Sequence, residues 1–329
     1  MNLKTLLKKW TLPMAMLFGI TVYLLFAFIP VLEPAAVLLS PFMDAILPLF
    51  MFLILYVTFC KVDFRNLIPV RWHFWVGVFQ VFFVALIVGA ILLFNVKGNN
   101  LILLESILTC IIGPCAAAAA VVTMKLGGSL EEMTTYIFLS NFLCAILIPI
   151  CFPLIEPGNG MGFWSSFLLI LYKVCAILVV PMILAYITKH FKPLHHFHLW
   201  LTNVKDLSFY LWGCSLTIVT GTTMKNIVHA NAGVPFLLLI AFFGLMICIL
   251  QFAVGRYIGH FFQSTVNAGQ SLGQKNTAFA IWIAYTYLNP LSSVGPGCYI
   301  LWQNIINSIE IWYYGKYKTS KRGGSEVCT

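Results

Sequence analysis

Charged residues are scarce in this sequence. Asp, Glu, Lys and Arg together make up 9% of the 329 residues, and only 10 residues are acidic. A soluble domain has about a quarter of its residues charged. Hydrophobic residues instead reach 61%, and the mean hydropathy is +0.94. This composition excludes an ordinary soluble domain and indicates a polytopic membrane protein.

The chain also lacks the alternation of apolar and polar residues that is typical of membrane β-strands, since runs such as residues 236–243 are continuously apolar. A bilayer core of roughly 30 Å needs about 20 apolar residues per helix, and the sequence offers about ten such segments. We therefore expect an all-α polytopic membrane protein. Its predicted spans are 11–30, 41–60, 73–95, 101–123, 131–154, 170–188, 206–224, 233–255, 268–289 and 293–314.

Metal-binding and redox patterns are missing as well. The ten cysteines include no CxxC pair and have no histidine at metal-ligand spacing. His195, His196 and His198 follow the sixth span without a Cys or carboxylate nearby, which favours an interfacial loop over a metal site. The acids inside predicted spans, Asp44 and Glu105 among them, are scattered and do not form a catalytic pair. We expect no metal, no cofactor and no enzymatic activity.

The N-terminus has no signal-peptide cleavage site, so residues 12–30 are interpreted as a retained first helix. Basic residues fall mainly in every second loop, which places both termini in the cytoplasm and favours an even number of spans. Their spread fits lipid headgroups better than nucleic acid. We expect an integral protein of a prokaryotic inner or plasma membrane. The cytoplasmic set is Lys4, Lys8, Lys9, Lys61, Arg65, Arg71, Lys125, Lys189, Lys192, Lys205, Arg256, Lys316, Lys318, Lys321 and Arg322.

Two predicted spans carry helix-breaking residues near their centre. The fourth contains Gly113-Pro114 followed by small residues, and the ninth contains the glycine-broken polar stretch 269–278. Proline removes a backbone donor, and the freed carbonyls persist at membrane depth only inside protein or beside water. Each break lies in the fourth span of a five-span half, a pattern that indicates an inverted repeat and a transport site at the midplane. The alternative for either span is a simple proline kink.

Lys275 lies in the second of these breaks. A charge inside a membrane is costly and by default marks a substrate, ion or proton pathway. The alternative is a structural cation bound by carbonyls and by an acid such as Glu105 or Glu310.

Further polar residues occur in neighbouring spans: Ser140 and Asn141 in the fifth, and Gln303, Asn304 and Asn307 in the tenth. They could line a site or form interhelical hydrogen bonds. The hydroxyl-rich patch at 217–222 in the seventh span could line a substrate path or allow close helix packing.

With these breaks, the chain resembles the bile acid:sodium symporter family of secondary transporters. The resemblance implies that spans four and nine are discontinuous and cross at the centre. It also implies a core domain of residues 73–154 and 233–314 and a panel domain of residues 1–72 and 155–232, leaving 315–329 as a cytoplasmic tail.

The sodium motifs of that family are degenerate here. When its Pro-Gly-Gly-x-x-Ser-Asn motif is aligned on Pro114, Ala119 and Ala120 occupy the sodium-ligating Ser-Asn positions. When its Glu-x-Gly-x-Gln-Asn-Ser/Thr motif is aligned on Gly273, Ser271 replaces the glutamate and Lys275 replaces the glutamine. Asn276 and Thr277 are retained. Two unit charges about 4 Å apart repel by roughly 4 kcal/mol at an effective dielectric near 20, which disfavours sodium binding.

The resemblance therefore implies a secondary transporter of an organic anion, such as a bile salt or a small carboxylate, that works by alternating access in the lipid bilayer. We expect Lys275 to replace sodium. Proton coupling (H+ as partner) and uncoupled uniport stay open, as do sodium coupling through non-standard ligands and a receptor or channel role. The candidate substrate and ion-coupling residues are Lys275, Asn276, Thr277, Ser271, Gln274, Gly273, Gly113, Pro114, Ala119, Ala120, Ser140, Asn141, Gln303, Asn304 and Asn307.

Overall fold

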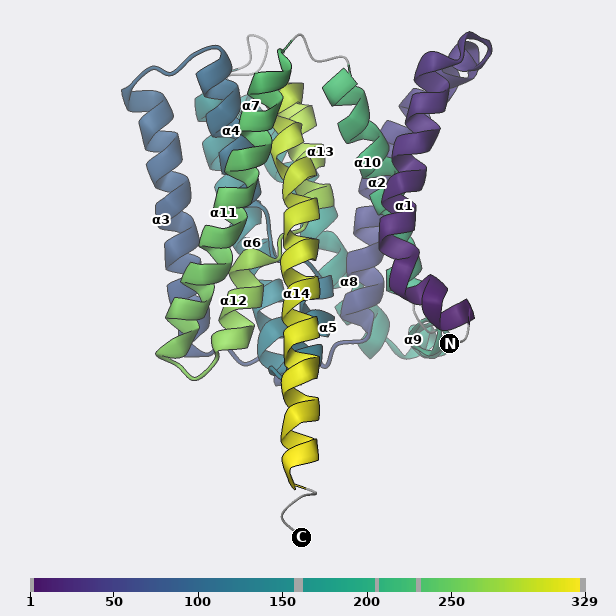
Figure 1. Ribbon diagram of the computed structural model, residues 1–329, viewed down its shortest axis with the longest axis vertical. Helices are drawn as coiled ribbons and strands as arrows, with labels where there is room; N and C mark the ends of the chain where they lie inside the picture. The colour runs from purple at the N-terminus through teal and green to yellow at the C-terminus, as the bar shows by residue number, and fades with distance from the viewer. Residues whose placement is uncertain (1–2, 157–161, 205–206, 229–231, 326–329) are drawn as a thin grey trace.

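The structure, a computed structural model, describes residues 3–156, 162–204, 207–228 and 232–325. Its described elements are fourteen α-helices and four short 3-10 helices. The start of α1 and the end of α14 lie at the same, lower end of the helical bundle (Figure 1). The bounds of the first six helices are α1 Leu3–Phe28, α2 Glu33–Cys60, α3 Arg71–Leu93, α4 Asn99–Ile112, α5 Ala118–Lys125 and α6 Leu130–Ile155.

The second part of the chain contains eight further described helices. Its helices are α7 Phe163–Leu178, α8 Val180–His190, α9 His195–Asn203, α10 Leu207–Val228, α11 Val234–His260, α12 Thr265–Gly273, α13 Thr277–Tyr287 and α14 Val294–Ser325. The 3-10 helices are η1 Pro30–Leu32, η2 Phe64–Asn66, η3 Lys192–Leu194 and η4 Pro290–Ser293. Because α14 continues to Ser325, most of the expected C-terminal tail extends this helix.

Several helices are suited to a membrane environment. Within the described residues, Arg71–Leu93, Leu130–Ile155, Phe163–His190 and Val234–His260 are long and apolar enough to cross a bilayer, and shorter apolar helices occur at Met14–Phe28, Ile46–Cys60 and Asn99–Ile112. Large apolar side chains such as Phe82 and Leu238 are mostly exposed on the outside of the bundle. A membrane protein has this distribution because lipid, not water, surrounds it.

The structure confirms both predicted interruptions. The fourth predicted span is divided into α4 and α5, and the ninth into α12 and α13. A third interruption was not predicted: the sixth span divides at Val179 into α7 and α8, where Pro181 stands in the first turn of the second helix. Proline is tolerated there because the first turn of a helix has no use for its missing N–H.

The histidine cluster and the hydroxyl patch have defined places in the structure. The histidines after the sixth span lie on helix α9 and not in a loop, and His198 Nε2 is 2.9 Å from the carbonyl oxygen of Cys60. Within the described residues, no group of His, Cys, Asp and Glu is arranged to hold a metal. The hydroxyl patch of the seventh span packs against α1, since Thr217 and Thr220 donate to the carbonyls of Ala15 and Met16 at 3.2 and 3.3 Å.

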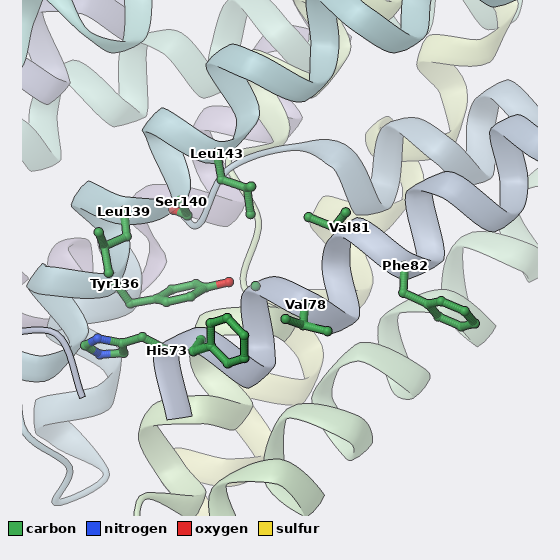
Figure 2. Close-up of a pocket in the computed structure, with 10 residues that line it drawn as sticks. His73, Val78, Val81, Phe82, Tyr136, Leu139, Ser140 and Leu143 are labelled. Atoms are coloured by element: carbon green, nitrogen blue, oxygen red, sulfur yellow. The ribbon is translucent and has the colours of Figure 1, made fainter. Parts of the chain in front are cut away.

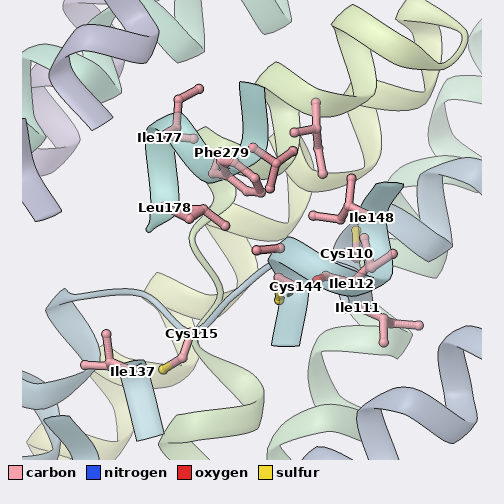
Figure 3. Packing of buried hydrophobic residues seen from close by; sticks show 14 of the residues in the cluster. Cys110, Ile111, Ile112, Cys115, Ile137, Cys144, Ile148, Ile177, Leu178 and Phe279 are labelled. Atoms are coloured by element: carbon pink, nitrogen blue, oxygen red, sulfur yellow. Dashed lines mark hydrogen bonds between the residues drawn. The ribbon is translucent and has the colours of Figure 1, made fainter. Parts of the chain in front are cut away.

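The hydrophobic core surrounds the two interruptions. Cys110, Ile112 and Cys115 on the α4 side pack with Cys144 and Ile148 of α6, and helices α7 and α13 close the cluster (Figure 3). The buried cysteines behave as small hydrophobic side chains, as expected. The fold thus places two unwound backbone segments in the centre of its best-packed region.

Candidate functional site

The two unwound segments, residues 113–117 and 274–276, cross in antiparallel orientation. Cys115 and Lys275 form an isolated β-bridge. The N–H of Ala116 donates to the Gln274 carbonyl at 2.9 Å, and the N–H of Asn276 donates to the Pro114 carbonyl at 2.8 Å. Backbone groups that the helices have released therefore pair with each other, as burial requires.

A following helix supports each segment with a side-chain acceptor. Ser140 Oγ of α6 accepts from the N–H of Cys115 at 3.1 Å. Gln303 Oε1 of α14 accepts from the N–H of Lys275 at 3.0 Å. The two bridged residues are thus held in the same way from helices at matching places in the two halves of the chain.

The carbonyl end of α4 attracts several donors. Gln80 Nε2 of α3 is 3.0 Å from the Ile111 carbonyl and 3.3 Å from those of both Ile112 and Gly113. Gln251 Nε2 of α11 donates to the Cys110 carbonyl at 3.1 Å. The last carbonyls of a helix have no partner in that helix, and the dipole gives them negative character. Donors from two other helices satisfy this end.

Lys275 adds an ammonium group to the same carbonyl end. The residue is 1% exposed, and its Nζ donates to the Gly113 carbonyl at 3.2 Å. The thiols of Cys144, Cys115 and Cys110 interact with it electrostatically. The lysine thus balances the negative end of α4 from inside the crossing.

Both carboxylates that could have paired with Lys275 bind elsewhere. Glu105 Oε2 accepts from Ser292 Oγ at 2.9 Å and from the N–H of Asn289 at 3.3 Å. Glu310 forms an ion pair with Arg256 and accepts from Gln270 Nε2 at 2.8 Å. Lys275 is therefore bound by a backbone carbonyl, as expected for a structural cation, but not by Glu105 or Glu310.

The positions aligned with sodium ligands offer few free oxygens. Ala119 and Ala120 are buried at the start of α5 and present methyl groups. Ser271 Oγ donates to the Ala268 carbonyl within α12 at 2.8 Å, and Asn276 Oδ1 caps α13 by accepting from the N–H of Phe279 at 3.2 Å. Thr277 lies at the start of α13 and its N–H donates to the Lys275 carbonyl at 2.9 Å.

The remaining expected residues differ in their placement. Asn141 Nδ2 and Asn304 Nδ2 donate to carbonyls of their own helices at 2.7 and 2.8 Å. Asn307 is 5% exposed, and neither of its polar atoms has a partner among the described residues. Gln274 Oε1 next to the lysine is likewise buried without a described partner. Sequence reasoning missed Gln80, although it is an isolated amide in an otherwise apolar stretch of the third span.

A groove of about 500 Å³ lies between α3 and α6, on the outer side of Ser140 (Figure 2). Its walls are mostly apolar, and Phe74 and Phe82 are largely exposed there. Ser140 connects the wall of the groove to the first unwound segment through its hydrogen bond with Cys115, and the groove itself is a feature of the outer surface.

Fold and site together define an all-helical integral membrane protein in which two broken helices cross beside a buried lysine. The profile of the sodium bile acid symporter family matches residues 48–230, more than half of the chain. The protein therefore belongs to this family. Members are secondary transporters of bile acids or related organic anions and not enzymes, so the partners are a lipid bilayer and a small-molecule substrate. A search of curated proteins found no match.

Proposed function

We propose that this protein carries an organic anion across the membrane by alternating access without sodium coupling, and that Lys275 supplies the positive charge that sodium supplies in other transporters of the family. The observation that carries the proposal is the buried ammonium 3.2 Å from the Gly113 carbonyl, inside the crossing of the two broken helices. No sodium ion is needed to neutralise a carbonyl end that a lysine already reaches.

The electrostatics oppose a second cation at this place. A sodium ion bound to the same carbonyls would lie within about 4 Å of the ammonium, where the repulsion is roughly 4 kcal/mol at an effective dielectric near 20. That energy corresponds to roughly a thousandfold loss of affinity. The methyl groups of Ala119 and Ala120 cannot compensate, because hard cations require oxygen ligands.

The same geometry favours an anion. Helices α5 and α13 both begin at the crossing, at Ala118 and Thr277. Helix N-termini carry unpaired N–H groups and a partial positive charge, which suits carboxylate, sulfate or sulfonate groups. Lys275 lies two residues before α13 and pairs with Cys115, which lies three residues before α5, so its full charge adds to these N-termini. We assign the negatively charged group of the substrate to this region.

The architecture that we propose has about ten spans: α1, α2, α3, α4 with α5, α6, α7 with α8, α10, α11, α12 with α13, and α14. The exchange of backbone hydrogen bonds between the two breaks supports an inverted repeat. The basic connections after α2, α5 and α8 lie at the lower end with the start of α1 and the end of α14 (Figure 1), which supports a cytoplasmic location for that end. We keep the core domain at residues 73–154 and 233–314 and the panel domain at residues 1–72 and 155–232.

A second candidate is sodium coupling through non-standard ligands. Gln80 Oε1, Asn141 Oδ1 and Gln274 Oε1 are buried around the crossing without a partner among the described residues. Amide oxygens are suitable ligands for a hard cation. This candidate requires Lys275 to lose its proton or move away when sodium binds.

Uptake into proteoliposomes tests the role of Lys275. The substrate for the assay is the bile salt, steroid sulfate or small carboxylate that gives the largest thermal stabilisation of the purified protein. We expect Lys275→Gln to lower uptake at least about tenfold, because the loss of one interaction of about 1.4 kcal/mol changes an affinity by that factor. The matched control Lys97→Gln removes an exposed lysine from the α3–α4 connection and should leave uptake unchanged. Full uptake by Lys275→Gln would reduce the lysine to a packing role.

A further inference from the structure

Buried polar side chains line a seam between α12 and α14 below the crossing. Gln303, Asn307 and Glu310 lie on one face of α14, because residues four and three apart share a face. Gln270 of α12 joins this face through its hydrogen bond to Glu310. Helix α5 packs against both helices and contributes Thr123. We call these five residues the α12–α14 seam.

Four polar atoms of the seam lack a hydrogen-bond partner among the described residues. They are Thr123 Oγ1, Gln270 Oε1, and Nδ2 and Oδ1 of Asn307. The three side chains are 0%, 1% and 5% exposed. Leaving a buried polar group unsatisfied costs about 1 to 3 kcal/mol, so nearly all such groups find a partner or an ordered water. A buried water makes roughly 2 to 4 polar contacts, and orphaned atoms on three helices are the kind of partner that it uses.

The seam has a different character at each end. At its lower end Glu310 pairs with Arg256, whose side chain is 43% exposed, so this end meets solvent. At its upper end Gln303 accepts from the backbone N–H of Lys275. Above the crossing, α13 presents Phe279, Ala280 and Ile281, each 0% exposed. Polar groups therefore lead to the crossing along α12 and α14, whereas the first turns of α13 on the other side are apolar.

We propose that ordered water fills the α12–α14 seam and connects the crossing at Lys275 with the lower aqueous face, giving this region a path for proton exchange. The inference deepens the proposed function, because it provides a route by which the buried lysine could exchange its proton. The other titratable groups at the crossing include the thiols of Cys110, Cys115 and Cys144. They also include the phenol of Tyr299, which donates to the Gly273 carbonyl, and the phenol of Tyr136, which interacts with Cys115 and Cys144. Arg256 and Glu310 are the charged groups at the mouth.

Hydrogen–deuterium exchange of the full-length protein in lipid nanodiscs, read by mass spectrometry on peptides that contain residues 274–276, tests the seam. In the wild type, these amides should exchange measurably within hours in spite of their burial. Asn307→Leu replaces the orphaned amide with an apolar group of similar size and should slow this exchange at least about tenfold. Thr123→Val, which keeps the shape of its side chain, should act in the same direction.

The matched control is Asn304→Leu, because the Asn304 amide donates to the carbonyl of Ile300 in its own helix. Exchange at 274–276 should match the wild type in this variant. If the exchange rates at 274–276 are equal in the wild type and in all three variants, the proposed water-filled seam is wrong. It is also wrong if Asn304→Leu slows the exchange as much as Asn307→Leu does. The exchange assay needs no substrate, so it is independent of the uptake assay. If the seam variants leave exchange unchanged but Lys275→Gln abolishes uptake, only the seam is refuted. Slowed exchange combined with full uptake would refute only the transport role of the lysine.

Discussion

Restoring the sodium motifs should create sodium binding where the wild-type protein has none. The perturbation is the combined variant Ala119→Ser, Ala120→Asn, Ser271→Glu and Lys275→Gln, which returns oxygen ligands to both breaks and removes the ammonium. All four positions lie in or beside the crossing and are buried. The variant thus reverses every departure from the family motifs that we hold responsible for the loss of sodium.

The magnitude follows from the geometry at Gly113. Removing the ammonium eliminates a repulsion of roughly 4 kcal/mol toward a cation at the same carbonyls, which is about three orders of magnitude in affinity. If the restored site binds sodium with a Kd near 1 mM, then about 100 mM sodium stabilises the folded state by about 2.7 kcal/mol. A thousandfold weaker site gives less than about 0.1 kcal/mol at the same concentration.

Thermal unfolding in NaCl against choline chloride at equal ionic strength measures this difference. We expect a rise in Tm of several degrees for the combined variant, no shift for the wild type, and a smaller shift for Lys275→Gln alone, which removes the repulsion but adds fewer ligands. The reasoning is refuted if sodium stabilises the wild type as much as the combined variant.

Three further outcomes are expected. Gln80→Leu leaves the carbonyl end of α4 without its shared donor and should lower the stability by about 1 to 3 kcal/mol, seen as a lower Tm; an unchanged Tm would contradict this. Gly19→Ala places a methyl group against a backbone carbonyl of α10 and should lower Tm, whereas Gly89→Ala, which meets nothing within 4 Å, should leave Tm unchanged or raise it; equal effects would refute the close packing of α1 on α10. The pKa of Asp63 is lowered by the backbone N–H of Arg65 and by a nearby lysine. Its contribution is therefore present above the ordinary Asp pKa of about 3.9 and lost as the pH falls through the lower pKa of the folded state, so the Tm difference from Asp63→Asn should shrink in acid.

The sequence predicted the interruptions of the fourth and ninth spans because their causes are local. Pro114 cannot donate a hydrogen bond, and the glycines around Lys275 weaken the helix without help from neighbours. The interruption at Val179 was not predicted, because a single proline in one span suggests a kink and the other half of the chain offers no matching break. The orientation expected from the basic residues stays a prediction, and it too was read from each loop on its own.

The partners of the buried groups could not be predicted in this way. Which carbonyl Lys275 reaches depends on how the two broken helices cross, and that crossing unites residues 162 positions apart in the chain. Glu105 and Glu310 were equally reasonable partners on sequence grounds, but Ser292 and Arg256 occupy them. Gln80 became visible only when α3 was seen to lie against the carbonyl end of α4.

The most direct measurement of the central claim is uptake by wild-type proteoliposomes with and without an inward sodium gradient, with potassium or choline as the replacement cation and the pH held equal on both sides. We predict equal initial rates and equal accumulation in all three salts, because Lys275 already occupies the place of the driving ion. Accumulation that depends on the sodium gradient would contradict the account.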